Sequence, residues 1–184
     1  MTAALTGQRG RAGLLVAGLG LAVAARSVVG AADPRAALLF AALLTVVSWL
    51  SGWRPARPGP AWWGWGLVGA AGLVAGPLLR GAPRWHPGGF GGWAVVVTAV
   101  VVGEEVLLRG ALWQALQPRL GVAATIGVTA ALFAVVHLPL YGARALPLDV
   151  MAGVWLGVIR WGSGTLAAPA MAHLLADWAG WWLA

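Results

Sequence analysis

Long apolar runs alternate along this chain with short segments rich in Arg, Pro and Gly. The runs are continuous rather than polar at every second position, which favours helices over half-buried strands. A helix needs about 20 apolar residues to cross the hydrocarbon core of a bilayer. The pattern predicts helical spans over 12–31, 36–52, 62–80, 93–116, 120–141, 147–161 and 164–183.

Two segments separate these runs most clearly. The linker from Arg54 to Pro60 holds three prolines and cannot continue a helix. A second Pro/Gly-rich segment runs from Gly81 to Gly92, and we interpret its His86 as a solvated loop residue. Residues 1–25 have some signal-like character, with Arg9 and Arg11 before an apolar run, but we interpret them as part of the first span.

Composition points to lipid as the solvent. The chain has 184 residues, of which 60% are hydrophobic and 9% are charged, whereas a soluble domain carries about 25% charged residues. Ten of the thirteen Trp fall near predicted span ends, as in the aromatic belts of membrane proteins. We therefore predict an all-α, polytopic transmembrane helical bundle of about six to eight spans, forming a single integral membrane domain.

The net charge of +7 comes from twelve scattered Arg, which we interpret as interfacial anchors and topology signals. Among them, Arg144 and Arg160 are assigned to the interface together with Tyr141. No basic stripe exists, so the sequence argues against nucleic-acid binding and for contact with the lipid bilayer. The absence of cysteine excludes disulfides, thiol nucleophiles and Cys-type zinc sites.

The five acidic residues divide into two groups. Asp33 and Asp149 lie at predicted span boundaries, where water or a helix N-terminus can satisfy them, and Asp149 is predicted as an N-cap. Glu104, Glu105 and Asp177 lie inside predicted spans. A charge near the bilayer centre costs at least ~2.5–3.5 kcal/mol on insertion scales, so intramembrane acids are candidates for function.

Spacing relates these acids to the other polar residues of the spans. Glu105 and Arg109 are four residues apart, as are His173 and Asp177, so each pair shares a helix face. Glu104 points about 100° away from Glu105 on a helix, towards other spans. The site predicted from this pattern lies in the core helices and consists of Glu104, Glu105, Arg109, His137, His173 and Asp177.

This set of side chains suggests the activation of water for attack on a carbonyl. Two His and one carboxylate suffice for a tetrahedral Zn²⁺ site with an open water position, so His137 and His173 are candidate ligands of a divalent metal such as zinc. The same side chains can hold a water directly, without metal. The HExxH pattern of zincin helices is absent.

Three motifs resemble those of the CPBP intramembrane proteases, also called the CAAX prenyl protease type 2 or Abi family, to which the lysostaphin resistance protein A-like proteins belong. The family carries EExxxR, FxxxH and HxxxN/D on separate transmembrane helices. Here they stand as Glu104 to Arg109, Phe133 to His137 and His173 to Asp177. The resemblance covers 93–184, which would form a catalytic core after the N-terminal spans and loops of 1–92.

The resemblance implies an intramembrane endopeptidase of glutamic or metallo type. Glu104 would activate water, and His137 and His173 would position that water or a metal. Asp177 stands where many members have Asn, and an ionised Asp cannot donate a hydrogen bond to an oxyanion. The implied substrate is a membrane-associated peptide or protein, prenylated or otherwise lipid-anchored in some members. The implied location is the plasma membrane of a prokaryote.

Two other functions fit parts of the pattern. A catalytically inactive relative could bind a membrane partner as a maturation or immunity factor. A proton-coupled carrier could use Glu104 and Glu105 as proton sites, although inverted repeats are not visible in the sequence.

Overall fold

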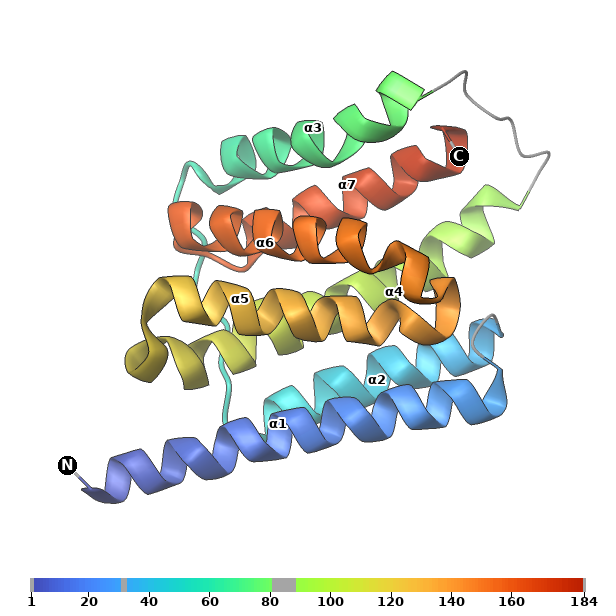
Figure 1. The fold of residues 1–184 in the computed structure, drawn as a ribbon. Helices are drawn as coiled ribbons and strands as arrows, with labels where there is room; N and C mark the ends of the chain where they lie inside the picture. The colour runs from blue at the N-terminus through green and yellow to red at the C-terminus, as the bar shows by residue number, and fades with distance from the viewer. Residues whose placement is uncertain (1, 31–32, 81–88, 184) are drawn as a thin grey trace.

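The computed structural model describes residues 2–30, 33–80 and 89–183, and His86 lies outside them. The described residues contain no strand and form an all-helical bundle, as predicted (Figure 1). Its elements are α1 (Thr2–Val29), α2 (Pro34–Leu50), α3 (Trp62–Arg80), α4 (Phe90–Glu105), the π-helix η1 (Val106–Leu112), α5 (Trp113–Tyr141), the short 3-10 helix η2 (Ala143–Ala145), α6 (Leu146–Ser163) and α7 (Ala167–Leu183).

The stretch from α4 through η1 to α5 is one helical path that turns back on itself. Gly121 has φ 75° and ψ 175° inside α5, a backbone conformation that favours glycine. The chain reverses there, so that residues 122–141 return alongside η1 (Figure 1). The reversal lies two residues after the gap predicted at 117–119, inside the start of the predicted run 120–141.

The helices lie in roughly parallel rows, with the C-terminal half of the chain in the middle. Figure 1 shows α1 and α2 along one side of the bundle and α3 along the other. Helix α2 packs against α4 and η1, while α3 packs against α7 and α6. The N-terminal helices therefore flank α4 to α7 on two sides.

Small residues allow the closest helix contacts. A Cβ on Gly103 of α4 would lie 2.9 Å from the carbonyl oxygen of Ala41 in α2, and one on Gly153 of α6 would lie 2.7 Å from the Cα of Ala130 in α5. Such contacts are typical of helix association in membranes. A Cβ on Gly157, four residues after Gly153, would lie 3.0 Å from Ile126, so both glycines pack closely against α5.

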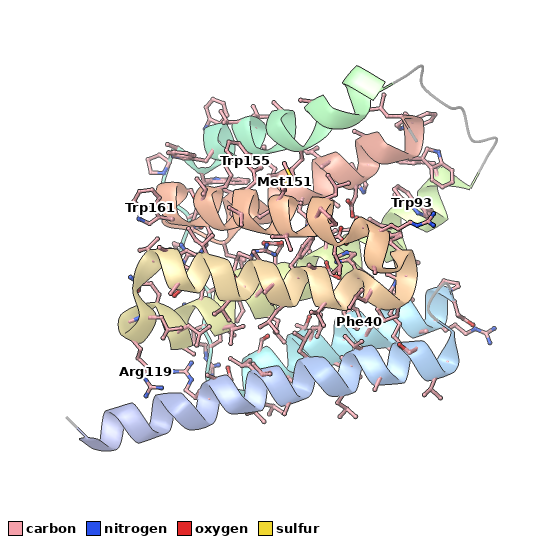
Figure 2. The ribbon with its side chains drawn as sticks, in the orientation of Figure 1. Phe40, Trp93, Arg119, Met151, Trp155 and Trp161 are labelled. Carbon is pink, nitrogen blue, oxygen red and sulfur yellow. The ribbon has the colours of Figure 1, made fainter. Side chains whose placement is uncertain are left out.

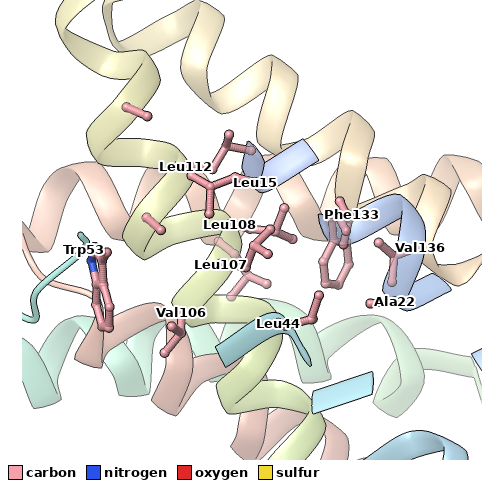
Figure 3. Close-up of a cluster of buried hydrophobic side chains, with 14 of the residues drawn as sticks. Leu15, Ala22, Leu44, Trp53, Val106, Leu107, Leu108, Leu112, Phe133 and Val136 are labelled. Atoms are coloured by element: carbon pink, nitrogen blue, oxygen red, sulfur yellow. The ribbon is translucent and has the colours of Figure 1, made fainter. Parts of the chain in front are cut away.

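The apolar core lies where α1, α2, η1 and α5 meet. Figure 3 shows Leu15, Leu44 and Leu112 converging with the other large side chains of this cluster. Leu107 and Leu156 are fully buried in it as well. The cluster surrounds η1, so the segment that follows the two glutamates is enclosed by packed side chains.

Large apolar side chains also cover the outside of the bundle. In α1, Val28 is 87% exposed and Leu21 is 64% exposed. Two helical segments of the described chain are long and apolar enough to cross a membrane, Gly10–Val29 and Phe90–Tyr141, and the second contains the reversal at Gly121. Shorter apolar helices cover Pro34–Leu50 and Trp62–Ala75. An apolar exterior of this kind suits lipid better than water.

The helix ends agree with most, but not all, of the sequence-based expectations. Asp33 is the N-cap of α2, and its side chain accepts a hydrogen bond from the amide of Arg35 at 2.7 Å. The N-cap prediction for Asp149 was wrong, because α6 begins at Leu146 and Asp149 lies within its first turn. Trp161 and Trp93 lie at opposite ends of the bundle (Figure 2), as expected of interfacial aromatics.

Candidate active site

The charged residues predicted for the site come from three parts of the bundle. Glu104 and Glu105 end α4, and Arg109 follows in η1; all three are 2% exposed or less. His137 lies near the end of α5, and His173 lies in α7. The structure brings these groups together across helices α4, α5 and α7.

Glu105 is the centre of a buried network. Its Oε1 accepts a hydrogen bond from Nη1 of Arg109 at 2.8 Å, which confirms the predicted pair. The same oxygen lies 3.1 Å from Nδ1 of His173, a residue 68 positions further along the chain. Because a carboxylate paired with Arg accepts hydrogen bonds, His173 carries its proton on Nδ1 and donates it to Glu105. Glu105 thus links α4 to α7.

Glu104 lies beside this network rather than within it. It interacts electrostatically with His137, His173, Asp177 and Glu105, so it lies near both histidines. Its side chain is buried and, unlike that of Glu105, is not paired with Arg109 in an ion pair. The two adjacent glutamates therefore occupy different environments, as the spacing on the helix predicted.

His137 is oriented by its own helix. Its Nδ1 lies 2.8 Å from the carbonyl oxygen of Phe133, which can only accept, so Nδ1 carries the proton and Nε2 is left as an acceptor. His173 is held in the same way, through Nδ1, by Glu105. Nε2 of His137 can therefore bind a water or a metal, whereas Nε2 of His173 faces Asp177 at 3.7 Å.

Phe133 packs against three members of the site. Its ring lies 4.5 Å from the His137 ring and 5.3 Å from the His173 ring, in an edge-on arrangement with the latter. The guanidinium carbon of Arg109 lies 4.9 Å from the centre of the same ring. The phenylalanine of the second motif thus fixes the positions of both histidines by packing.

Asp177 lies at the outer edge of the cluster. Its Oδ2 is 3.7 Å from Nε2 of His173, an ion-pair distance longer than a hydrogen bond, and its side chain is 41% exposed. Tyr141 stacks on His137 with the ring centres 5.7 Å apart and is 64% exposed. These two residues mark the side on which the cluster opens to its surroundings.

The described residues contain no group of three or more His, Asp or Glu side chains placed to hold a metal ion. His173 is bound through Nδ1 to Glu105, and its Nε2 faces Asp177. The arrangement therefore fits a water held by side chains better than the three-ligand zinc site considered from the sequence.

Sequence reasoning missed two features of the site. The π-helix η1 follows the glutamates directly, and nothing in its apolar sequence distinguishes it from an α-helix. Arg160, which the sequence assigned to the interface, lies in the last turn of α6 and donates from Nε to the carbonyl oxygen of Arg109 at 2.9 Å. The signal that could have found it is an arginine inside an apolar run, two helical turns after Gly153.

Comparison with known proteins agrees with this geometry. Residues 86–179, about half of the chain, match the family model described as type II CAAX prenyl endopeptidase Rce1-like. No curated protein and no solved structure matches significantly. The chain therefore belongs to the Rce1-like family of CAAX-type intramembrane proteases, which confirms the resemblance inferred from the three motifs. The family and the apolar helices together support a membrane protein of the CAAX endopeptidase type.

Proposed function

We propose that this protein is a multi-pass intramembrane endopeptidase in which Glu104 activates the attacking water. The observation that carries the proposal is the difference in surroundings between two adjacent buried glutamates. Glu105 forms ion pairs with Arg109 and His173, whereas Glu104 forms no ion pair with Arg109 and lies within electrostatic range of both histidines. Glu104 is therefore the carboxylate free to exchange a proton.

The reaction follows from these positions. Glu104 takes a proton from water, and the resulting hydroxide attacks the carbonyl carbon of the scissile peptide bond. Nε2 of His137 accepts a hydrogen bond from the same water and orients it. The tetrahedral intermediate collapses when the C–N bond breaks and protonated Glu104 delivers its proton to the leaving amine. Water is consumed, and two shorter peptides are released.

Glu105 and Arg109 serve this chemistry indirectly. Arg109 holds the Glu105 carboxylate in place, and Glu105 in turn accepts a hydrogen bond from His173 and fixes its ring. Protonated His173 can offer Nε2–H to the developing oxyanion, a role that ionised Asp177 cannot take. Asp177 then acts on the orientation and charge of His173.

The substrate and the setting belong to the same proposal. The cluster lies among apolar helices, so its substrate is a membrane-associated peptide or protein, with prenylated or lipid-anchored chains as the first class to test. The plasma membrane of a prokaryote is the proposed location. Residues 93–184 are proposed as the catalytic core, supported by the match over 86–179.

The test is cleavage of a panel of fluorogenic peptides, prenylated and unmodified, by the purified protein in lipid nanodiscs. Glu104→Gln keeps the shape of the side chain and removes the base. Asp33→Asn is the matched control, because it makes the same change at a helix cap that Asn also fills well. The proposal predicts cleavage by wild type and Asp33→Asn, and none by Glu104→Gln.

Adding the chelator phenanthroline to the same cleavage assay tests whether activity requires a metal. Activity that survives the chelator supports water held by side chains alone, whereas its loss and recovery with added Zn²⁺ would assign His137 and His173 to a metal. Absence of cleavage across the panel by a folded wild-type protein would favour the inactive, partner-binding relative instead.

A further inference from the structure

The backbone changes its hydrogen bonding directly after the two glutamates. In an α-helix, the amide of Trp113 would donate to the carbonyl of Arg109, four residues earlier. Here it donates to the carbonyl oxygens of Leu108 and Gly110. The wider turn of η1 therefore directs the amide of Trp113 away from the carbonyl of Arg109, its α-helical acceptor, and π-helical turns of this kind are frequent at functional sites.

Arg160 of α6 donates a hydrogen bond to the carbonyl oxygen of Arg109. Its Nε lies 2.9 Å from the carbonyl oxygen of Arg109. Its guanidinium carbon also lies 5.3 Å from the ring centre of Trp113, the residue that follows η1. A buried carbonyl without a donor is costly in an apolar setting, and in lipid no water replaces the lost partner. Arg160 therefore donates to a buried carbonyl oxygen that the amide of Trp113 no longer reaches.

The same helix face binds the other end of Arg109. Nη2 of Arg109 donates to the carbonyl oxygen of Gly153 at 3.0 Å. Gly153 and Arg160 are seven residues apart, so they lie two turns from each other on one face of α6. Leu156, between them, is fully buried. Helix α6 thus holds the side chain of Arg109 at one point and its backbone at another.

We propose that Arg160 is a positioning residue of the active site, which holds η1 in its π-helical form and so fixes Arg109 against Glu105. The inference rests on the proposed function and deepens it. Without Arg160, η1 would gain by returning to α-helical hydrogen bonding, and the direction of Arg109 relative to Glu105 would change. His173, bound to the same Glu105 oxygen, would lose its orientation.

Two substitutions separate the hydrogen bond from the charge. In Arg160→Gln, the side-chain amide nitrogen is attached to Cδ, as Nε of arginine is, so the donor is kept without the charge. Arg160→Met has a similar length and no donor. Arg57→Met, in the exposed linker between α2 and α3, controls for the loss of one arginine. Each is compared with wild type for kcat, KM and hydrogen exchange of residues 106–113.

The expected result is a split between the two variants. Arg160→Met lowers kcat on the order of tenfold to a hundredfold with KM unchanged, as a small misplacement of catalytic groups does. It also speeds hydrogen exchange of residues 106–113. Arg160→Gln and Arg57→Met stay close to wild type in both measurements.

Other outcomes overturn the inference. Equal activity losses in Arg160→Gln and Arg160→Met would assign Arg160 to a charge effect such as interfacial anchoring. Wild-type activity in Arg160→Met would remove its role altogether and leave the proposed function intact. An inactive wild type would instead overturn the proposed function, and the positioning role would fall with it.

Discussion

Polar side chains in an apolar bundle need hydrogen-bond partners, and those of helices α1 to α3 find them in a different place from the charged side chains of helices α4 to α7. In the first group, hydroxyls bond to their own helix: Ser27 to the carbonyl of Val23, and Ser48 to that of Leu44. In the second group, hydroxyls such as those of Thr98 and Thr129 also bond to their own helix. The charged side chains, however, form bonds between helices: from His173 to Glu105, from Arg109 to Gly153 and from Arg160 to Arg109.

The two kinds of hydrogen bond differ in whether they fix the position of one helix relative to another. A hydroxyl bonded four residues back satisfies its polar group but places no constraint on a neighbouring helix. A bond between helices sets the distance and rotation of both. The N-terminal helices therefore support the bundle through packing and through the carbonyl oxygen of Gly69, which accepts from Nε1 of Trp155 in α6. The charged side chains of α4 to α7 hold one another in a defined arrangement, as a hydrolytic site requires. The family match over 86–179 falls on this second part of the chain.

The largest effect on stability is expected from Arg109→Met. The change leaves Glu105 buried and charged without its main partner, and breaking a buried pair costs about 3–5 kcal/mol. The thermal midpoint in nanodiscs should fall sharply, while that of Arg57→Met should stay near wild type. Similar midpoints for the two variants would mean that the buried pair contributes little to the fold.

Phe133→Leu compares the two regions directly, because Phe40 of α2 is its counterpart. Both rings are buried, and each lies beneath an arginine: Arg109 is 4.9 Å from Phe133, and Arg26 is 5.1 Å from Phe40. Each substitution should cost about 0.5–1.5 kcal/mol in lost aromatic contacts. Only Phe133→Leu should also lower kcat, since its ring packs on both histidines. A kcat loss of the same size in Phe40→Leu would contradict the distinction between the regions.

Gly103→Ala tests how the flanking helices support the site. The new Cβ would lie 2.9 Å from the backbone of Ala41, so α2 and α4 must separate at a cost of about 1–3 kcal/mol. Because Glu104 is the next residue, kcat should fall along with the thermal midpoint. Gly20→Ala in α1 meets nothing within 4 Å and should leave both measurements unchanged or raise stability slightly. Unaltered kcat in Gly103→Ala would show that the site tolerates movement of α2.

The smallest effect is expected from Asp177→Asn. The side chain is 41% exposed and lies 3.7 Å from His173, and an exposed ion pair contributes about 0.2–1 kcal/mol. The corresponding change in kcat/KM is about fivefold at most. A loss far beyond that would give Asp177 a direct part in the chemistry.

The positions of the helices could be predicted from the sequence, whereas most contacts between them could not. The apolar runs predicted the positions of the main helices, because lipid requires long apolar segments. The Pro/Gly-rich segments between the runs predicted where helices end. The pair of Glu105 with Arg109 followed from helical spacing alone. The link from His173 to Glu105 did not, because it depends on how α7 packs against α4. The role of Arg160 depends on the π-helix, and an apolar run carries no signal for a change in backbone hydrogen bonding.

The most direct test of the central claim compares two adjacent residues, Glu104→Gln and Glu105→Gln, by kcat and thermal midpoint in the same nanodiscs. The account predicts that Glu104→Gln loses about 10²–10⁴-fold in kcat, the usual contribution of a general acid–base, with its midpoint unchanged. Glu105→Gln should lose stability as well as activity, because it breaks the network with Arg109 and His173. Retained activity in Glu104→Gln, or equal losses of stability in both variants, would contradict the assignment of Glu104 as the base.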